Sequence, residues 1–221
     1  MGPRAIIFDL LTALLDSWSL WAEAANNNEA SYRWRTRYLE LTFGCGAYRP
    51  YEDLVYESAR DVGLPESVPK ALLANWDRLK PWPEVKEVLQ QLKEKGYQLG
   101  VVSNCSIELG RRAAALCGIE FDAVVTAEEA GFYKPRPEAY AKIRSALGVE
   151  AKDALFVAGS NGDVVGAAKA GMDVVWHNRI GLPALPGSRP SLEGRSLRIV
   201  LEYLRRVESS SSGANRASSR L

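Results

Sequence analysis

Side chains that can act as nucleophiles, acids or bases follow several apolar runs of the chain, each near the point where a run ends. In chain order they are Asp9, Ser103 with Asn104, Lys134 and Asp163. A carboxylate such as Asp9 can act as a nucleophile, and an ammonium such as Lys134 keeps a neighbouring carboxylate ionised. If the apolar runs are parallel strands, their carboxyl ends meet at one sheet edge, where such sheets bind ligands. The alternative for Asp9 alone is that it caps the next turn.

The apolar run 5–8 has strand length and no polar alternation, which is typical of a central parallel strand. The same criterion predicts further strands at 98–103, 123–126, 155–158 and 174–177. Helical periodicity and stop signals predict helices at 84–95, 111–117, 136–147, 164–171 and 197–204. Strands that alternate with helices indicate an α/β fold, a Rossmann-like doubly wound parallel sheet with right-handed crossovers.

The segment after the first strand has a different composition, rich in helix formers and aromatic residues and lacking Val and Ile runs. We therefore predict a helical cap, residues 17–81, inserted after the first strand of a core formed by residues 1–16 and 82–207. Residues 208–221 are Ser-rich and low in apolar residues, so we predict a flexible tail. The cap aromatics line a pocket or form a homodimer surface; they include Trp34, Tyr38, Phe43 and Tyr48.

Charge and cysteine usage exclude several classes of function. The formal net charge is +1 and the basic residues are scattered, so neither nucleic-acid nor membrane-surface binding is indicated. Cys45, Cys105 and Cys117 form no CxxC pair, which argues against a disulfide framework or a zinc site and favours a reducing compartment. His177 is the only histidine, so mechanisms that need several histidines are excluded.

The expected location is the cytoplasm, because no apolar run approaches membrane-spanning length and no signal sequence is visible. The chain ends in Ser219, Arg220 and Leu221, which is similar to a peroxisomal import signal. The alternative location is therefore the peroxisomal matrix, if the source is eukaryotic.

Taken together, the four polar motifs in this order resemble those of the haloacid dehalogenase-like hydrolase superfamily, over nearly all of residues 5–204. Phosphatases of that superfamily carry a second Asp two residues after the nucleophile, where this chain has Leu11. Their fourth motif supplies acidic ligands for magnesium, where this chain has Ala158 and Gly159. Magnesium prefers several oxygen ligands in octahedral geometry, so a phosphatase is disfavoured.

The subgroup that works without the second Asp and without metal is the 2-haloacid dehalogenases. The segment YRWRTRYLELTF, residues 32–43, is similar to their arginine-bearing segment, which places an active-site arginine at Arg35. The alternative for Arg35 is a solvated charge like its neighbours Arg33 and Arg37. The segment FVAGSNGDVVGAA, residues 156–168, and the later WHNRIG are similar to the subgroup's fourth motif and the strand after it. The resemblance implies no metal and no cofactor.

This resemblance implies nucleophilic attack by Asp9 on the α-carbon of a small 2-substituted carboxylic acid, followed by hydrolysis of the ester by water. Lys134 would keep Asp9 ionised, and Asp163 would position Lys134 or help to activate water. Arg35 and Asn104 would stabilise the departing anion.

The remaining expected binding residues surround these groups. Ser103 and its neighbouring amides would hold the substrate carboxylate. Tyr140 matches a family tyrosine near Lys134, or packs as a core aromatic. The set is completed by Leu11, Ser160 and Asn161.

The chain also departs from the subgroup. A family threonine four residues after the nucleophile corresponds to Ala13, while Thr12 lies one residue early. In the fourth motif the family serine, asparagine and tryptophan correspond to Ala158, Ser160 and Gly162. These changes affect water positioning and pocket shape.

Three alternatives to a dehalogenase therefore stay open. One keeps attack at carbon but displaces another leaving group, such as the ring nitrogen of a strained cyclic amino acid. Another is a magnesium-dependent small-molecule phosphatase. The third is a non-catalytic binding protein, which the joint retention of six polar site residues argues against. Those residues are Asp9, Arg35, Ser103, Asn104, Lys134 and Asp163.

Overall fold

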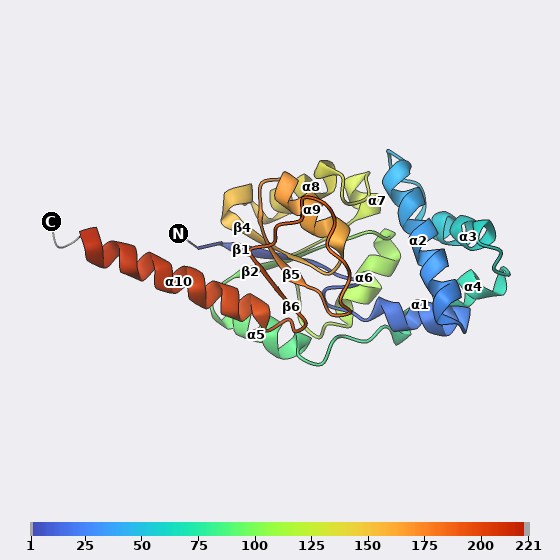
Figure 1. The fold of residues 1–221 in the computed structure, drawn as a ribbon, viewed down its shortest axis with the longest axis horizontal. Helices are drawn as coiled ribbons and strands as arrows, with labels where there is room; N and C mark the ends of the chain where they lie inside the picture. The colour runs from blue at the N-terminus through green and yellow to red at the C-terminus, as the bar shows by residue number, and fades with distance from the viewer. Residues whose placement is uncertain (1, 219–221) are drawn as a thin grey trace.

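A six-stranded sheet, in which all strands are parallel, forms the centre of the molecule (Figure 1). The computed structural model describes the backbone of residues 2–218 and the side chains of residues 2–210. The strands are β1 (Ala5–Asp9), β2 (Gln98–Ser103), β3 (Ala123–Thr126), β4 (Ala154–Ala158), β5 (Asp173–His177) and β6 (Leu192–Gly194). Their spatial order is β3-β2-β1-β4-β5-β6. The strand order reverses beside β1, so the crevice at the carboxyl ends of β1 and β4 is the expected ligand position.

Helices cover both faces of the sheet, which confirms the predicted α/β architecture. Alternate residues of β1 enter two separate apolar clusters: Ile6 and Phe8 pack with residues of α5, α6 and α10, while Ala5 and Ile7 pack with residues of α8 and α9. The helices of this part are α5 (Val85–Glu94), α6 (Ile107–Ala115), α7 (Ala127–Ala130), α8 (Pro137–Leu147), η2 (Ala151–Asp153), α9 (Asn161–Lys169) and α10 (Ile199–Ser218).

Between β1 and α5 the chain forms helices, which lie at the end of the molecule opposite the tip of α10 (Figure 1). We call this part the helical segment. It comprises α1 (Ser17–Ala25), α2 (Asn28–Gly44), α3 (Tyr51–Asp61), α4 (Ser67–Ala74) and η1 (Trp76–Arg78). The Trp76 indole Nε1 donates a hydrogen bond of 2.9 Å to the carbonyl oxygen of Leu109, and the Tyr38 hydroxyl donates one of 3.1 Å to that of Asn104. These contacts join the helical segment to the sheet side of the molecule.

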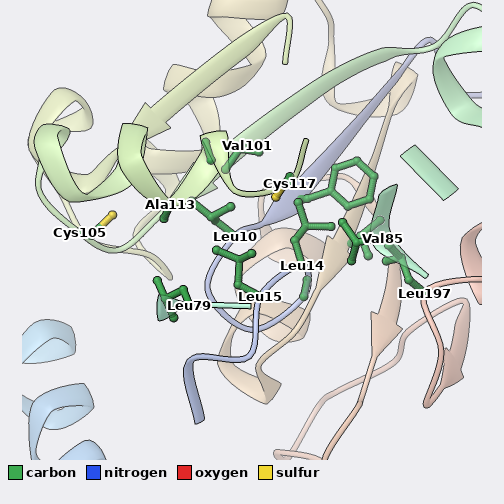
Figure 2. Close-up of a cluster of buried hydrophobic side chains, with 14 of the residues drawn as sticks. Leu10, Leu14, Leu15, Leu79, Val85, Val101, Cys105, Ala113, Cys117 and Leu197 are labelled. Carbon is green, nitrogen blue, oxygen red and sulfur yellow. The ribbon is translucent and has the colours of Figure 1, made fainter. Parts of the chain in front are cut away.

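The loop that follows Asp9 is anchored by its leucines. Leu10, Leu14 and Leu15 are fully buried and point into one apolar cluster (Figure 2). The cluster also includes Val85 of α5, Val101 of β2 and Ala113 of α6, together with Leu79, Cys105, Cys117 and Leu197 from the segments between elements. Because burying such side chains stabilises the fold by about 1.5–3 kcal/mol each, the loop is held in one position beneath the site.

Some boundaries differ from those predicted from the sequence. Helix α6 begins at Ile107, four residues before the expected start, although Gly110 lies within it. Strand β6 was not expected because its three residues, LEG, form no apolar run. Helix α10 continues past the expected end at 204 to Ser218, with the hydroxyls of Ser209 and Ser210 bonded to carbonyls one turn earlier. Flexibility of residues 208–221 stays a prediction, and the ending at 219–221 lies outside the described residues.

Among residues 2–218, none of the helices is both long enough and apolar enough to span a membrane. Homodimer formation and the division into core and cap domains stay predictions.

Candidate active site

Asp9 ends β1 and lies at the centre of a tight turn. Its Oδ2 accepts hydrogen bonds from the Thr12 amide at 2.9 Å, the Thr12 hydroxyl at 2.5 Å and the Ala13 amide at 3.1 Å. The turn is held in place because Asp9 and most of the residues up to Leu15 are buried, with Leu10, Leu14 and Leu15 in the apolar cluster described above. Three donors on one carboxylate oxygen stabilise the ionised form of Asp9 and fix its orientation.

Lys134 bonds to two carboxylates, Asp9 at the end of β1 and Asp163 after the end of β4. Its Nζ donates to Asp9 Oδ1 at 2.7 Å and to Asp163 Oδ2 at 2.8 Å. The Tyr140 hydroxyl, from α8, donates to the other oxygen of Asp163 at 2.9 Å. The main chain of Lys134 is held by Asn104, whose side-chain oxygen accepts from the Lys134 amide at 2.7 Å and whose Nδ2 donates to the Lys134 carbonyl at 3.0 Å. Loops after β1, β2, β3 and β4 thus meet at one point, as expected.

Burial and charge shift the acid–base behaviour of this network. Burial alone would raise the pKa of Asp9, but the Lys134 ammonium and the Thr12 donors hold that pKa below its usual value. Burial and the nearby Asp9 charge raise the pKa of Asp163 above its usual value, against the pull of Lys134. Burial opposes the charge on Lys134, yet Asp163 and Asp9 together raise its pKa. Asp9 is therefore the ionised nucleophile candidate and Asp163 the better proton acceptor.

Arg35 brings a buried positive charge to the site from α2. Its side chain is only 9% exposed, its Nη2 donates to the Ser17 hydroxyl at 2.9 Å, and its guanidinium lies over the Trp18 ring at 3.7 Å. Nη1 is buried with no hydrogen-bond partner. Burial lowers the pKa of Arg35 to about 10, so the group stays charged at neutral pH. A buried cation with an unused donor needs an anion, and a bound ligand can supply one.

A cavity of about 240 Å³ lies between the helical segment and the carboxyl ends of the strands. Its polar wall includes Asp9, Thr12, Arg35, Asn104, Lys134 and Asp163. Its apolar wall includes Leu11, Trp18, Trp21, Tyr32, Leu39 and Phe43, most of them from α1 and α2. The cavity therefore combines ionised groups at its base with an apolar side that suits a small organic molecule.

The structure brings most of the sequence-predicted residues to this cavity: Asp9, Leu11, Arg35, Asn104, Lys134, Ser160, Asn161 and Asp163. Ser160 caps α9, since its hydroxyl accepts from the Asp163 amide at 3.3 Å. The Asn161 side chain donates to the Pro183 carbonyl at 2.9 Å. Of the cap aromatics, Tyr38 and Phe43 line the cavity, whereas Trp34 does not and donates to Val55 and Ser58 inside the helical segment.

Two predicted binding residues do not line the cavity. Ser103 is fully buried, and its hydroxyl accepts a hydrogen bond of 3.5 Å from the Cys105 thiol, so its role in holding the substrate stays a prediction. Tyr140 is also fully buried and reaches the site only through Asp163.

Sequence reasoning missed Thr12 and the residues of α1. The hydroxyl of Thr12 bonds the nucleophile candidate although it lies three rather than four positions after it. Trp18 and Ser17 hold Arg35 from one side. A signal existed for α1, because Asp16 is a typical N-cap and its side chain accepts from the Ser19 amide.

The donor set does not fit the magnesium ion used by phosphatases of the superfamily. Both carboxylates, Asp9 and Asp163, already hold the Lys134 ammonium, which occupies the space between them. A Cβ at Gly159 would lie 2.2 Å from the Ala13 amide nitrogen, which leaves no room for an acidic side chain there. Residues 2–218 contain no cluster of three or more His, Cys, Asp or Glu side chains suited to a metal ion.

Comparison with known proteins places the chain in a family. The model of a family described as haloacid dehalogenase-like hydrolase matches residues 6–177. The chain belongs to this family of hydrolases. The match spans β1 to β5 and hence all four loops that form the site.

Individual relatives of this hydrolase agree with that placement. It is 31% identical to haloacetate dehalogenase H-2 of Moraxella sp. (strain B), over 80% of this chain and 87% of the relative. A crystal structure of an L-2-haloacid dehalogenase is similar with a TM-score of 0.84 and 29% identity, covering 93% of this chain and 100% of the other. A glyceraldehyde 3-phosphate phosphatase of Methanopyrus kandleri is also 31% identical, over 78% of this chain and 82% of the relative.

Proposed function

We propose that this hydrolase displaces the leaving group, a halide in the first instance, from the α-carbon of a small 2-substituted carboxylic acid. The observation that carries the proposal is the buried guanidinium of Arg35, with its unpartnered Nη1, on the same cavity as the ionised Asp9. A negative leaving group is stabilised by such a cation as it departs. Relatives and structural neighbours named as haloacid dehalogenases support the substrate class.

The chemistry follows from the charges of the site. An oxygen of Asp9 attacks the α-carbon, the carbon–halogen bond breaks, and the halide leaves toward Arg35 and Asn104. Lys134 keeps Asp9 ionised for this attack. Main-chain amides near Ser103 hold the substrate carboxylate. Water then cleaves the Asp9 ester, and Asp163, whose pKa is raised, accepts a proton from it.

Phosphatase activity is a weaker proposal, although one relative of similar identity carries a phosphatase name. A phosphoryl group brings several negative charges, which phosphoryl-transfer sites neutralise with metal ions. Here the two carboxylates are already bonded to Lys134, and Leu11 cannot act as the general acid.

The test is chloride release from chloroacetate and from (S)-2-chloropropionate in the presence of EDTA, compared between the intact protein and Asp9→Asn. We expect release by the intact protein and none by the variant, which keeps the volume of Asp9 but lacks its nucleophile. A parallel assay offers p-nitrophenyl phosphate with magnesium. Turnover of the phosphoester alone would contradict the proposal, and absence of both activities would point to another leaving group or to binding without catalysis.

Arg35→Met tests the role of the buried guanidinium in the proposed reaction. Loss of the guanidinium at the leaving group should lower kcat/KM for chloride release by about 100-fold. Arg33→Met is the matched control on the same helix, because Arg33 is exposed and does not line the cavity. Equal effects of the two changes would exclude a specific role for Arg35.

A further inference from the structure

The two carboxylate oxygens of Asp9 have different surroundings. Oδ2 accepts three hydrogen bonds, from the Thr12 amide, the Thr12 hydroxyl and the Ala13 amide, at 2.9, 2.5 and 3.1 Å. Oδ1 accepts one, from Lys134 Nζ at 2.7 Å. The lone pairs of Oδ2 are engaged by these donors, whereas Oδ1 keeps one available for attack. In the reaction proposed above, Oδ1 is therefore the attacking atom and becomes the bridging oxygen of the ester, while Oδ2 becomes its carbonyl oxygen.

We infer that Thr12 is a catalytic residue for the second half-reaction, in which its hydroxyl and amide, with the Ala13 amide, stabilise the negative charge on Oδ2 during ester hydrolysis. The inference rests on the proposed function. The two amides, at 2.9 and 3.1 Å, lie at the distances typical of oxyanion-stabilising donors, and the Thr12 hydroxyl lies closer, at 2.5 Å. They come from a turn whose leucines are fixed in the core, so they need not reorganise as the charge develops.

The atoms of this half-reaction balance. Water adds to Cγ of the ester and gives one proton to Asp163, while the carbonyl electron pair moves to Oδ2. The Cγ–Oδ1 bond then breaks, and the departing oxygen takes a proton from Lys134, whose Nζ lies 2.7 Å from Oδ1. Lys134 recovers a proton from Asp163 across their 2.8 Å hydrogen bond. The products are a 2-hydroxy acid and the regenerated Asp9 carboxylate, with one proton released overall.

Thr12 can supply the hydroxyl that the family threonine, replaced here by Ala13, would provide. The turn presents the hydroxyl of Thr12 to Asp9, and the Trp82 indole holds the Thr12 carbonyl with a hydrogen bond of 3.1 Å. Gly159 packs against this residue so closely that a Cβ there would lie 2.4 Å from the Thr12 hydroxyl oxygen. Trp82 therefore holds the main chain of Thr12, and Gly159 packs closely against its hydroxyl.

The experiment compares the intact protein, Thr12→Val and Thr12→Ser with (S)-2-chloropropionate. Valine keeps the shape of threonine but removes the hydroxyl, and serine restores a hydroxyl. We expect Thr12→Val to release about one chloride per enzyme at a near-normal rate and then to turn over about 100-fold more slowly, which is typical of a lost oxyanion donor. Intact-protein mass spectrometry should show the enzyme carrying the propionate fragment on Asp9, and Thr12→Ser should recover at least part of the rate.

Four outcomes would overturn the inference. A first-turnover chloride release that is slowed as much as the steady state would place Thr12 in the attack step. Normal turnover by Thr12→Val would show that the hydroxyl is dispensable. Absence of both chloride release and adduct in the intact protein would remove the proposed function itself. Circular dichroism and the Tm of each variant separate these outcomes from misfolding, and a folded Thr12→Val without accumulated ester also counts against the inference.

Discussion

Lys134 is a single cation shared by two buried carboxylates, so the ionisation of each group depends on the others. Its contacts lower the pKa of Asp9 but do not bring the pKa of Asp163 to its usual value. One ammonium cannot fully compensate two buried negative charges, and the carboxylate that also has the Thr12 and Ala13 donors keeps its charge more readily. The division into a nucleophile and a proton acceptor therefore arises from unequal hydrogen bonding.

Lys134→Met should move the acid limb of the pH–rate profile upward. In the intact protein the pKa of Asp9 is held below its usual value, so activity is lost only as the pH falls toward that depressed pKa. Without the ammonium, burial raises the pKa of Asp9, and the variant should lose chloride release at a higher pH and reach a lower plateau. The measurement is first-turnover chloride release across the pH range in which each variant stays folded. An unchanged acid limb would show that Lys134 does not control Asp9.

At the scale of elements, the predicted strands and the loops after them agree with the structure because apolar runs of strand length are strong local signals. The pairing of Arg35 with Ser17 and Trp18 was not predictable, since it depends on how α1 and α2 cross. Thr12 was missed because a one-residue offset in a turn changes which side chain reaches Asp9. Helix α6 was placed too late because Gly110 favours a break, whereas there it allows close packing: a Cβ at that position would lie 2.5 Å from Thr126.

Helix α2 forms one side of the cavity mouth, and Phe43 near its end should limit substrate size. Phe43 is 46% exposed and lines the cavity, and its Cζ would lie 3.4 Å from a Cβ on Gly162 at the start of α9. Phe43→Ala should raise kcat/KM for 2-bromohexanoate relative to chloroacetate by about 10-fold, the order expected from apolar pocket contacts.

Leu185→Ala is the control for this change, since Leu185 is also exposed but does not line the cavity. If both variants shift the ratio equally, or neither does, the end of α2 does not set the size limit.

At the scale of the molecule, the cavity exists because two parts of the chain are held against each other. The indole of Trp76 is fully buried at the junction and donates to Leu109 in α6, and Arg112 of α6 forms an ion pair with Asp77 of η1. The exposed ion pair contributes little, whereas the fully buried Trp76 contributes both the packing of its ring and a buried hydrogen bond. The junction should therefore depend mainly on Trp76.

Trp76→Phe tests the junction. It removes the indole hydrogen bond to the Leu109 carbonyl and part of a buried ring, so the free energy of unfolding should fall by about 1–3 kcal/mol. For a chain of this size that corresponds to a Tm lower by roughly 2–4 °C per kcal/mol. Urea unfolding measures the change, and Tyr32→Phe at an exposed position should stay within about 0.5 kcal/mol. A Trp76→Phe variant as stable as the intact protein would refute this account.

The close approach of Gly159 to the turn after β1 has a consequence for the evolution of this site. Any side chain at position 159 collides with the main chain of the turn, where the Ala13 nitrogen would lie 2.2 Å from its Cβ. An acidic residue there cannot be acquired by a single substitution without displacing Thr12 from Asp9. Conversion of this chain to cation-dependent phosphoryl transfer would therefore require an acid in place of Leu11 together with a rearranged turn that admits a side chain at 159. Attack at carbon and cation-dependent phosphoryl transfer thus differ in more than one residue of this turn, so no single substitution converts one site into the other.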